Sequence, residues 1–256
     1  MSEVVAHYEG LLAQHYTWML GADFDELVAE QRHLLDSCGA GPSGTHAGVA
    51  LDLGCGSGVH SVALAQLGHD TVLGVDISPT LIAELAARSA RFPAIRPVQA
   101  DLCAGLDAVV EAGSVTAAVC MGDTLPHLPD TTAVRRLVDG AFDALVQGGV
   151  FVLSFRDLTT PLTGLDRFLR LRADQDRIMT CFLEDEGDAV RVHDLVHTKD
   201  PDGAWQLGKS SYRKLRISPG WVAGQLREAG FAVAPLQAGP RGMCVMTARR
   251  PERASW

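Results

Sequence analysis

The stretch LDLGCGSGVHSVALAQLGHDTVLGVDISP, residues 51–79, restricts the fold more than any other part of the chain. It places three glycines at alternate positions, Gly54, Gly56 and Gly58, between an apolar run and a helix-like run. A second apolar run follows and ends at Asp76. Glycine tolerates backbone angles that other residues avoid, and it lets a ligand approach the main chain closely. The stretch therefore predicts a strand, a tight turn, a helix and a second strand around a bound ligand.

The same strand–helix rhythm continues to Phe155. Apolar runs predict strands at 49–53, 71–75, 96–99, 115–121 and 150–155. Helical spacing follows the first run, Ser78-Pro79 begins a second helix, and Asp130 or Thr131 begins a third. Strands without polar alternation, separated by helices, predict a parallel sheet that is covered on both faces.

The rhythm changes after Phe155. Residues 178–184, 189–199 and 205–217 predict strands joined by turn-rich EDEGD and KDPDGA, which indicates an antiparallel meander over about 159–216. A helix from Ser218-Pro219 to Gly230 and a strand pair at 231–236 and 243–248 then return to the first sheet. Residues 2–35 have helical spacing, and GAGPSGTHAG at 39–48 is typical of a linker.

Composition excludes several classes of function. The 256 residues suffice for one large domain, or for one domain with an appendage, and the formal net charge of −9 disfavours a nucleic-acid partner. None of the six cysteines forms a CxxC pair, which indicates buried thiols in a reduced protein. The sequence shows no signal peptide and no stretch of about 18 apolar residues, so we expect a cytoplasmic enzyme without a membrane partner.

The glycine turn predicts the type of ligand. Its N–H groups face the carboxyl edge of the sheet, and Asp76, 18 residues after Gly58, is placed to accept hydrogen bonds from ribose hydroxyls. A dinucleotide site needs G-x-G-x-x-G, whereas Val59 stands at the sixth position here. Asp52 would repel a pyrophosphate and attract an ammonium group. These features favour S-adenosylmethionine, a cation without phosphate.

The stretch resembles the first two motifs of class I S-adenosylmethionine-dependent methyltransferases. The resemblance implies an α/β fold, a Rossmann-like doubly wound seven-stranded sheet with an antiparallel β insert and an N-terminal helical lid. It also implies that Ala100-Asp101-Leu102 contacts the adenine ring. The expected cofactor-binding residues are Tyr8, Trp18, Asp52, Gly54, Cys55, Gly56, Gly58, Asp76, Ile77, Ala100, Asp101, Leu102, Met121 and Gly122.

The segment VCMGDTLPHLPD, residues 119–130, resembles the glycine N-methyltransferase group, in which a GNS-type turn and then HLPD follow the fourth strand. Residues 16–21 lie where that group places a tyrosine-bearing lid, Ser154–Asp157 matches its Arg-Asn step, and 211–216 resembles the last strand of its inserted sheet. The resemblance implies a lid at 1–45, a cofactor domain at 46–158 and 217–250, and an inserted substrate-side sheet at 159–216.

Two departures from that group bear on the acceptor. Asp123 replaces an amide of the turn, and Asp157 replaces the Asn that helps to hold an amino-acid substrate. Two carboxylates would disfavour a carboxylate acceptor by like-charge repulsion and favour an amine or a hydroxyl, although Arg156 could offset them.

The chemistry predicts few demands on catalytic side chains. An in-line attack on the sulfonium methyl needs alignment and exclusion of water, and a base only if the nucleophile must lose a proton. On position, the catalytic candidates are His127, Asp123, Asp157, Arg156 and Tyr16. Structural roles stay open: a backbone-bonded turn histidine for His127, a turn cap for Asp123, and core packing for Tyr8, Tyr16 and Trp18.

The leading hypothesis is transfer of a methyl group to a small-molecule acceptor, with an amine nitrogen preferred. O- or S-methylation, a nicotinamide-dependent oxidoreductase and a non-catalytic cofactor-binding module remain alternatives. We expect no metal, because His193 and His197 would lie far apart on a strand. No interface is evident from the sequence, so assembly into a homo-oligomer stays open.

Overall fold

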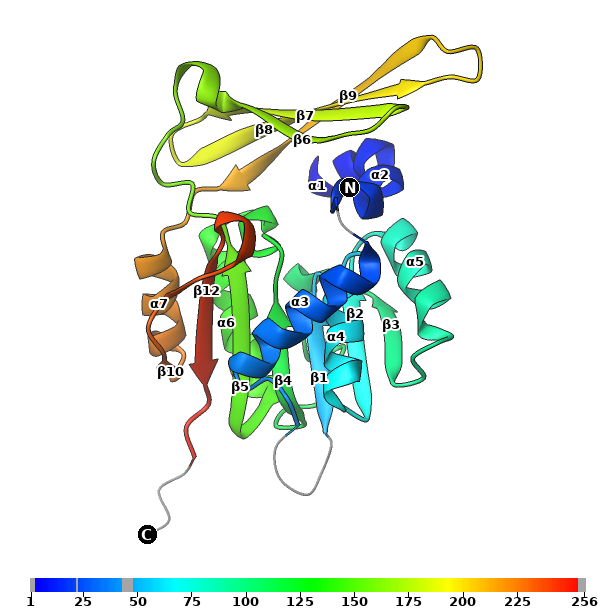
Figure 1. Cartoon of the computed structure of the whole chain (residues 1–256). Helices are drawn as coiled ribbons and strands as arrows, with labels where there is room; N and C mark the ends of the chain where they lie inside the picture. Colours follow the sequence, from blue (N-terminus) through cyan, green and yellow to red (C-terminus); the bar gives the residue numbers. More distant parts are fainter. Residues whose placement is uncertain (1–2, 22, 43–47, 253–256) are drawn as a thin grey trace.

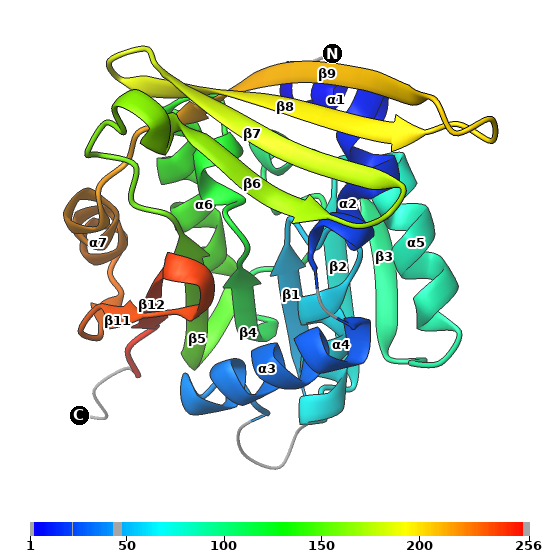
Figure 2. The same ribbon diagram turned by 45° about the horizontal axis from the view of Figure 1, so that its top comes forward.

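The computed structural model describes residues 3–21, 23–42 and 48–252. Figure 1 shows a large twisted sheet with helices on both faces and a smaller antiparallel sheet above its upper edge. Short N-terminal helices lie between the two sheets (Figures 1 and 2). No helix in the described part of the chain is long and apolar enough to cross a membrane.

The large sheet confirms the predicted strand–helix alternation. Its strands run in the order β10-β12-β5-β4-β1-β2-β3, and β11 pairs with β12 outside that path. The five strands from β5 to β3 pair in parallel, whereas β12 is antiparallel to β5 and β10. The bounds are β1 Val49–Leu53, β2 Thr71–Asp76, β3 Ile95–Gln99, β4 Val115–Cys120, β5 Leu145–Phe155, β10 Ala232–Val233, β11 Gln237–Ala238 and β12 Cys244–Arg249.

Helices cover both faces because the strands are apolar on both sides. Alternate residues of β1 pack on opposite faces: Ala50 packs in the core beneath α3 and α4, and Leu51 in the core beneath α6 and α7. The large-sheet helices are α3 Phe24–Ser37, α4 Val59–Leu67, α5 Pro79–Ser89, α6 Thr131–Ala144 and α7 Pro219–Glu228.

The predicted helix starts are confirmed by their caps. The side chains of Ser78, Asp130 and Ser218 accept hydrogen bonds from backbone amides in the first turns of α5, α6 and α7. Pro79 and Pro219 occupy first positions, where the missing N–H costs nothing. Short 3₁₀ turns also occur, η2 Leu102–Ala104, η3 Leu125–His127, η4 Gly164–Arg167 and η5 Pro240–Gly242.

The inserted sheet has one strand more than the meander predicts. Its order is β6-β7-β8-β9, all antiparallel, with bounds β6 Phe168–Ala173, β7 Arg177–Asp185, β8 Ala189–Lys199 and β9 Trp205–Leu215. The sequence FLRLRA of β6 is an edge strand that is largely exposed. With no buried face to impose alternation, this strand could not be predicted from the sequence.

The end of the chain also differs from the prediction. The expected strand at 231–236 is reduced to the two residues of β10, and the unpredicted β11 pairs with the start of β12. Gly239 and Pro240 then lead into η5, which redirects the chain into β12. The linker predicted at 39–48 lies partly outside the described residues.

The N-terminal helices pack between the two sheets. They comprise α1 Glu3–His7, the π-helical segment η1 Tyr8–Leu12 and α2 Ala13–Met19. Leu11 and Leu12 pack against Met179 and Val196 of the inserted sheet. Below the inserted sheet, the buried His7 Nε2 lies 3.0 Å from Asp194 Oδ2. The helices are therefore held by the insert and face the carboxyl edge of the large sheet.

Replacing Gly58 by Ala should destabilise the protein. Gly58 precedes α4 with φ 95°, and an added Cβ would clash with the buried Leu85 side chain. We expect a loss of roughly 1–3 kcal/mol in the free energy of unfolding, measured with urea. Gly224→Ala in α7 is the matched control, because a Cβ there meets nothing within 4 Å. It should be neutral or stabilise the helix by about 0.5–1 kcal/mol. Equal stability of the two variants would contradict the argument.

Candidate active site

The glycine turn after β1 lies at the base of the site. Gly54 and Gly56 have φ values of 74° and 53°, in the left-handed region. A Cβ on Gly54 would clash with Thr124, and one on Gly56 would lie 3.0 Å from the Tyr16 ring. The amides of Gly54 and Cys55 both donate to the Val75 carbonyl of β2, at 2.8 and 2.9 Å. Only glycine therefore allows this bend beneath the lid.

Asp76 holds the turn from the end of β2. Its Oδ2 accepts a hydrogen bond from the Gly56 amide, and its Oδ1 accepts one from the Ser78 amide, both at 2.9 Å. Burial raises the pKa of Asp76, and these backbone hydrogen bonds oppose that effect. Each carboxylate oxygen keeps a second lone pair, which can accept from a ligand hydroxyl.

An inner cavity of about 400 Å³ opens above this turn. Asp76, Ile77, Asp101, Leu102 and Cys103 line it from the sheet edge. Tyr8 and Tyr16 line it from the lid. The arrangement combines hydroxyl acceptors with an apolar slot, as a nucleoside requires. Of the predicted adenine-contacting residues, Asp101 and Leu102 line the cavity and their neighbour Ala100 does not.

Asp52 lies beneath the turn rather than in a cavity. It is fully buried, and its Oδ2 accepts a hydrogen bond of 2.6 Å from Ser61 Oγ. Its Oδ1 has no hydrogen-bond partner within the described ranges. Burial raises the pKa of Asp52 to about 7. This unpaired buried oxygen suits a nearby cationic or hydrogen-bonding ligand. Asp52 lines neither cavity, however, so the geometry does not support the predicted direct contact with the cofactor.

An outer cavity of about 630 Å³ adjoins the inner one. The residues that line both cavities are Tyr8, Tyr16, Gly54, Gly122 and His127. Cys55 and Met121 line only the outer cavity. The two cavities therefore meet above the glycine turn, beneath the two lid tyrosines.

Asp123 is engaged in an ion pair. Lys214 Nζ lies 2.5 Å from Asp123 Oδ2, the Arg156 amide donates to Oδ1 at 2.9 Å, and Arg156 Nη1 lies 3.5 Å from Oδ2. Burial disfavours the Asp123 carboxylate, but Lys214 and the Arg156 amide outweigh it and lower its pKa. Asp123 therefore remains ionised and neutralised, which makes it a poor proton acceptor and removes the repulsion predicted toward a carboxylate.

His127 lies where the two cavities meet. Its Nδ1 is 3.5 Å from the Tyr8 hydroxyl, and its ring packs edge-on against Tyr212, with centroids 5.1 Å apart. Its buried Nε2 has no hydrogen-bond partner among the residues described. Burial, and next the Lys214 ammonium, lower the pKa of His127 to about 3. The imidazole is therefore neutral at physiological pH, with one unsatisfied ring nitrogen.

Five predicted site residues line neither cavity: Asp52, Gly58, Ala100, Asp157 and Trp18. Asp157 is exposed and accepts hydrogen bonds from the amide and hydroxyl of Thr159 in a local turn. Trp18 faces the inserted sheet, where its Nε1 donates to Asp174 at 2.6 Å and the guanidinium groups of Arg172 and Arg177 lie over its ring. Trp18 therefore anchors α2 to the insert, and Asp157 is placed to stabilise a turn.

Sequence reasoning missed the residues that the insert contributes. Lys214, Tyr212 and Asp194 line the outer cavity from β8 and β9. Lys214 is 91 residues from Asp123, so no local motif connects them. Strand periodicity could have indicated two of them, because alternate residues of β9 share one face, and Tyr212 and Lys214 are two residues apart.

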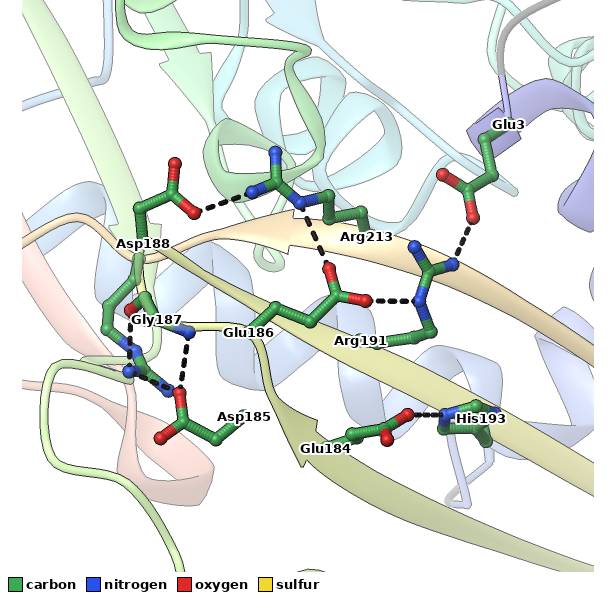
Figure 3. Close-up of polar contacts among 10 residues, drawn as sticks. Glu3, Glu184, Asp185, Glu186, Gly187, Asp188, Arg191, His193 and Arg213 are labelled. Atoms are coloured by element: carbon green, nitrogen blue, oxygen red, sulfur yellow. Dashed lines mark hydrogen bonds and ion pairs between the residues drawn. The ribbon is translucent and has the colours of Figure 1, made fainter.

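A polar network connects the lid to the insert (Figure 3). Arg191 forms ion pairs with Glu3 of the lid and with Glu186 of the β7–β8 turn. Arg213 in turn pairs with Glu186 at 3.1 Å and with Asp188 at 2.6 Å. Glu3 and Arg213 both line the inner cavity, so the network connects the lid to the insert beside it.

Asp52→Asn should change how stability depends on pH. The pKa of Asp52 is raised from 3.8 to about 7, so the folded state binds its proton more tightly than the unfolded chain does. The stabilisation is complete below about pH 4 and is lost as pH rises through about 7. The free energy of unfolding, measured with urea, should therefore rise for the variant relative to wild type between about pH 4 and pH 7. Above about pH 7 the difference should stay constant. Exposed Asp139→Asn is the control, and parallel curves for Asp52→Asn and wild type would contradict the account.

Comparison with known proteins identifies the domain. Residues 50–149 match the family described as "Methyltransferase domain". Over 106 residues the chain is 37% identical to the ubiquinone biosynthesis O-methyltransferase of Psychrobacter arcticus, which covers 41% of this chain and 39% of that protein. The chain thus matches about two fifths of the length of that curated relative.

Solved structures match nearly the whole fold. The CcbJ methyltransferase of Streptomyces caelestis aligns with a TM-score of 0.76 at 19% identity, over 96% of this chain and 98% of that one. The sugar N-methyltransferase KedS8 of a Streptoalloteichus species aligns with a TM-score of 0.72 at 20% identity, over 95% and 93%. These likenesses show that the fold, including insert and lid, is shared. The family match therefore identifies residues 50–149 as a methyltransferase domain within this fold.

Proposed function

We propose that the protein transfers a methyl group from S-adenosylmethionine to a small-molecule acceptor, with an amine nitrogen as the preferred acceptor atom. The observation that carries the proposal is the junction of two cavities at Tyr8, Tyr16, Gly54, Gly122 and His127. One cavity has the size and lining for a nucleoside, and the other is large enough for a metabolite.

The residues of the inner cavity fit the cofactor. The Asp76 carboxylate is placed to accept from ribose hydroxyls, and the slot at Leu102 and Cys103 suits a flat base. The glycine turn leaves space that a Cβ would fill, between the sheet and Tyr16. When bound, the cofactor supplies a sulfonium methyl group as the electrophile. We infer that Asp76, Ile77, Asp101 and Leu102 hold its adenosine part.

The chain's part in the transfer is to align the acceptor and exclude water. Tyr8 and Tyr16 cover the junction, and the helices that carry them pack against the inserted sheet. Asp123, Lys214 and Arg156 together carry one net positive charge, which disfavours a protonated amine in the outer cavity, so an amine would bind there with its lone pair free. His127 Nε2 can accept a hydrogen bond from the acceptor N–H and orient that lone pair.

The in-line step balances without an added reactant. The acceptor nitrogen forms the new N–C bond, the C–S bond breaks, and its electron pair returns to sulfur. The methylated ammonium then loses a proton to water. A neutral amine already carries a free lone pair, so the step needs no base. This agrees with the low pKa values of Asp123 and His127, which make both groups poor proton acceptors.

An acceptor screen tests the proposal. Amines, phenols, carboxylic acids and thiols would be incubated with labelled cofactor, and release of S-adenosylhomocysteine would be measured. Methylation of an amine supports the proposal, whereas exclusive methylation of oxygen or sulfur corrects the acceptor atom. Tight cofactor binding without turnover on any acceptor class would contradict the proposed activity.

His127→Ala should lower turnover of the best acceptor by roughly tenfold to hundredfold, because the acceptor loses its orienting hydrogen bond. Affinity for S-adenosylhomocysteine, measured by calorimetry, should change far less. His193→Ala is the control, since that exposed side chain pairs with Glu184 outside the cavities. Wild-type turnover should show no step near pH 6.5 from this imidazole, since its pKa is about 3. Unchanged turnover in His127→Ala would remove the residue from the site.

Arg191→Gln should speed release of S-adenosylhomocysteine by about two- to fivefold, since an exposed ion pair contributes at most about 1 kcal/mol. The variant removes the Arg191 charge that pairs with Glu3 of the lid. Stopped-flow dissociation should show the difference at low salt and lose it near 1 M salt, where the Debye length is about 3 Å. His193→Gln is again the control. A rate difference that persists at high salt would contradict this role.

A further inference from the structure

The outer cavity has more cationic than anionic side chains around it. Arg156, Arg170, Lys214 and Arg241 line it, whereas Asp123 and Asp194 are its lining carboxylates. Both carboxylates are buried and paired, with Lys214 at 2.5 Å and His7 at 3.0 Å respectively. In a chain of formal net charge −9, this cavity is a local region of positive charge.

One of these arginines, Arg241, has little to engage it within the protein. Arg170 of β6 lies on the other face of the insert, because β6 pairs Arg170 with Thr180 and Leu169 with the buried Cys181, which lines the cavity. Arg241 Nη2 lies 3.9 Å from Glu30 Oε2, and both side chains are 45% exposed, so this ion pair is weak. The Arg241 guanidinium is therefore available to a ligand in the cavity.

The backbone at Arg241 is strained. Its φ is 57°, and within residues 3–21, 23–42 and 48–252 the other non-glycine residue with positive φ is Asp123, at 79°. Both residues line the outer cavity. Left-handed conformations of non-glycine residues cost free energy and concentrate at ligand sites. This strain is a second observation that points to Arg241 as a binding residue.

The same cavity is bordered by exposed leucines. Leu162, Leu169 and Leu171 are 39%, 37% and 43% exposed, and all three line it. We call these three side chains the leucine shelf. Two of them lie on β6, which Figure 2 shows as an outer strand of the inserted sheet. Exposed apolar groups beside a cavity indicate a surface that a ligand covers.

We propose that the outer cavity takes an amphiphilic anion: an acceptor whose apolar body lies on the leucine shelf and whose anionic group binds Arg241. The inference rests on the proposed function, because it assigns this cavity to the acceptor. It replaces the expectation that Asp123 and Asp157 repel carboxylates, since Asp123 is neutralised and Asp157 lies outside.

The experiment uses 8-anilinonaphthalene-1-sulfonate, an aromatic anion that fluoresces in apolar sites, with the full chain saturated in S-adenosylhomocysteine. Decanoate and decan-1-ol, which differ in charge, are compared as displacing agents. The variants are Arg241→Gln and Leu171→Gln. Their controls are Arg167→Gln, whose guanidinium lies over Phe182, and Leu165→Gln, which is 85% exposed; neither control residue lines the cavity.

We expect one anilinonaphthalene sulfonate per chain, with affinity lowered about tenfold in both variants and unchanged in the controls. Decanoate should displace it at a concentration roughly tenfold lower than decan-1-ol does. Equal displacement by the two compounds, or equal affinity in variants and controls, would overturn the inference. So would a dimer, seen by light scattering, that Leu171→Gln converts to a monomer.

Calorimetry with S-adenosylhomocysteine keeps the two failures apart. If the protein binds S-adenosylhomocysteine but shows no charge-dependent binding of the probe, only the inference of an amphiphilic anion is refuted. Failure to bind the cofactor would instead refute the proposed function. Thermal melting of each variant checks that it remains folded. Because the substituted side chains are exposed, we expect unchanged melting temperatures, and a lost probe signal then reflects the site.

Discussion

The hydrogen bonds from the Gly56 and Ser78 amides to Asp76 are the contacts on which the rest of the site depends. They join the bend after β1 to the end of β2 and fix the open edge between two parallel strands. The carboxylate is desolvated there, and two charge-assisted bonds offset that cost. Without this connection, the glycine turn would have no fixed position beneath Tyr16, and the inner cavity would lose its shape.

The site is completed by contacts between segments that are remote in sequence. Lys214 of the insert pairs with Asp123 after β4, across 91 residues, and Trp18 of the lid bonds Asp174, across 156. A buried ion pair is a weak source of net stability, but breaking one partner is costly because a charge is left unpaired. We therefore regard these contacts as determinants of position: they hold lid and insert over the carboxyl edge of the sheet.

Much of the cofactor side could be predicted from local sequence. The glycine spacing, the apolar strands and the acid at position 76 each depend on backbone geometry within one βαβ unit. The acceptor side could not be predicted in the same way. The state of Asp123 depends on Lys214, and Trp18 turns toward the insert because Asp174, Arg172 and Arg177 lie there. Strand β6 escaped detection because an exposed edge strand has no buried face to impose a pattern.

The central claim is that the cofactor's sulfur lies where the inner and outer cavities meet. A crystal structure with S-adenosylhomocysteine tests it most directly. We predict the ribose hydroxyls on Asp76, the adenine beside Leu102, and the sulfur facing the outer cavity near His127 and Tyr16. A cofactor that binds elsewhere, or one whose sulfur faces away from the outer cavity, would contradict the account.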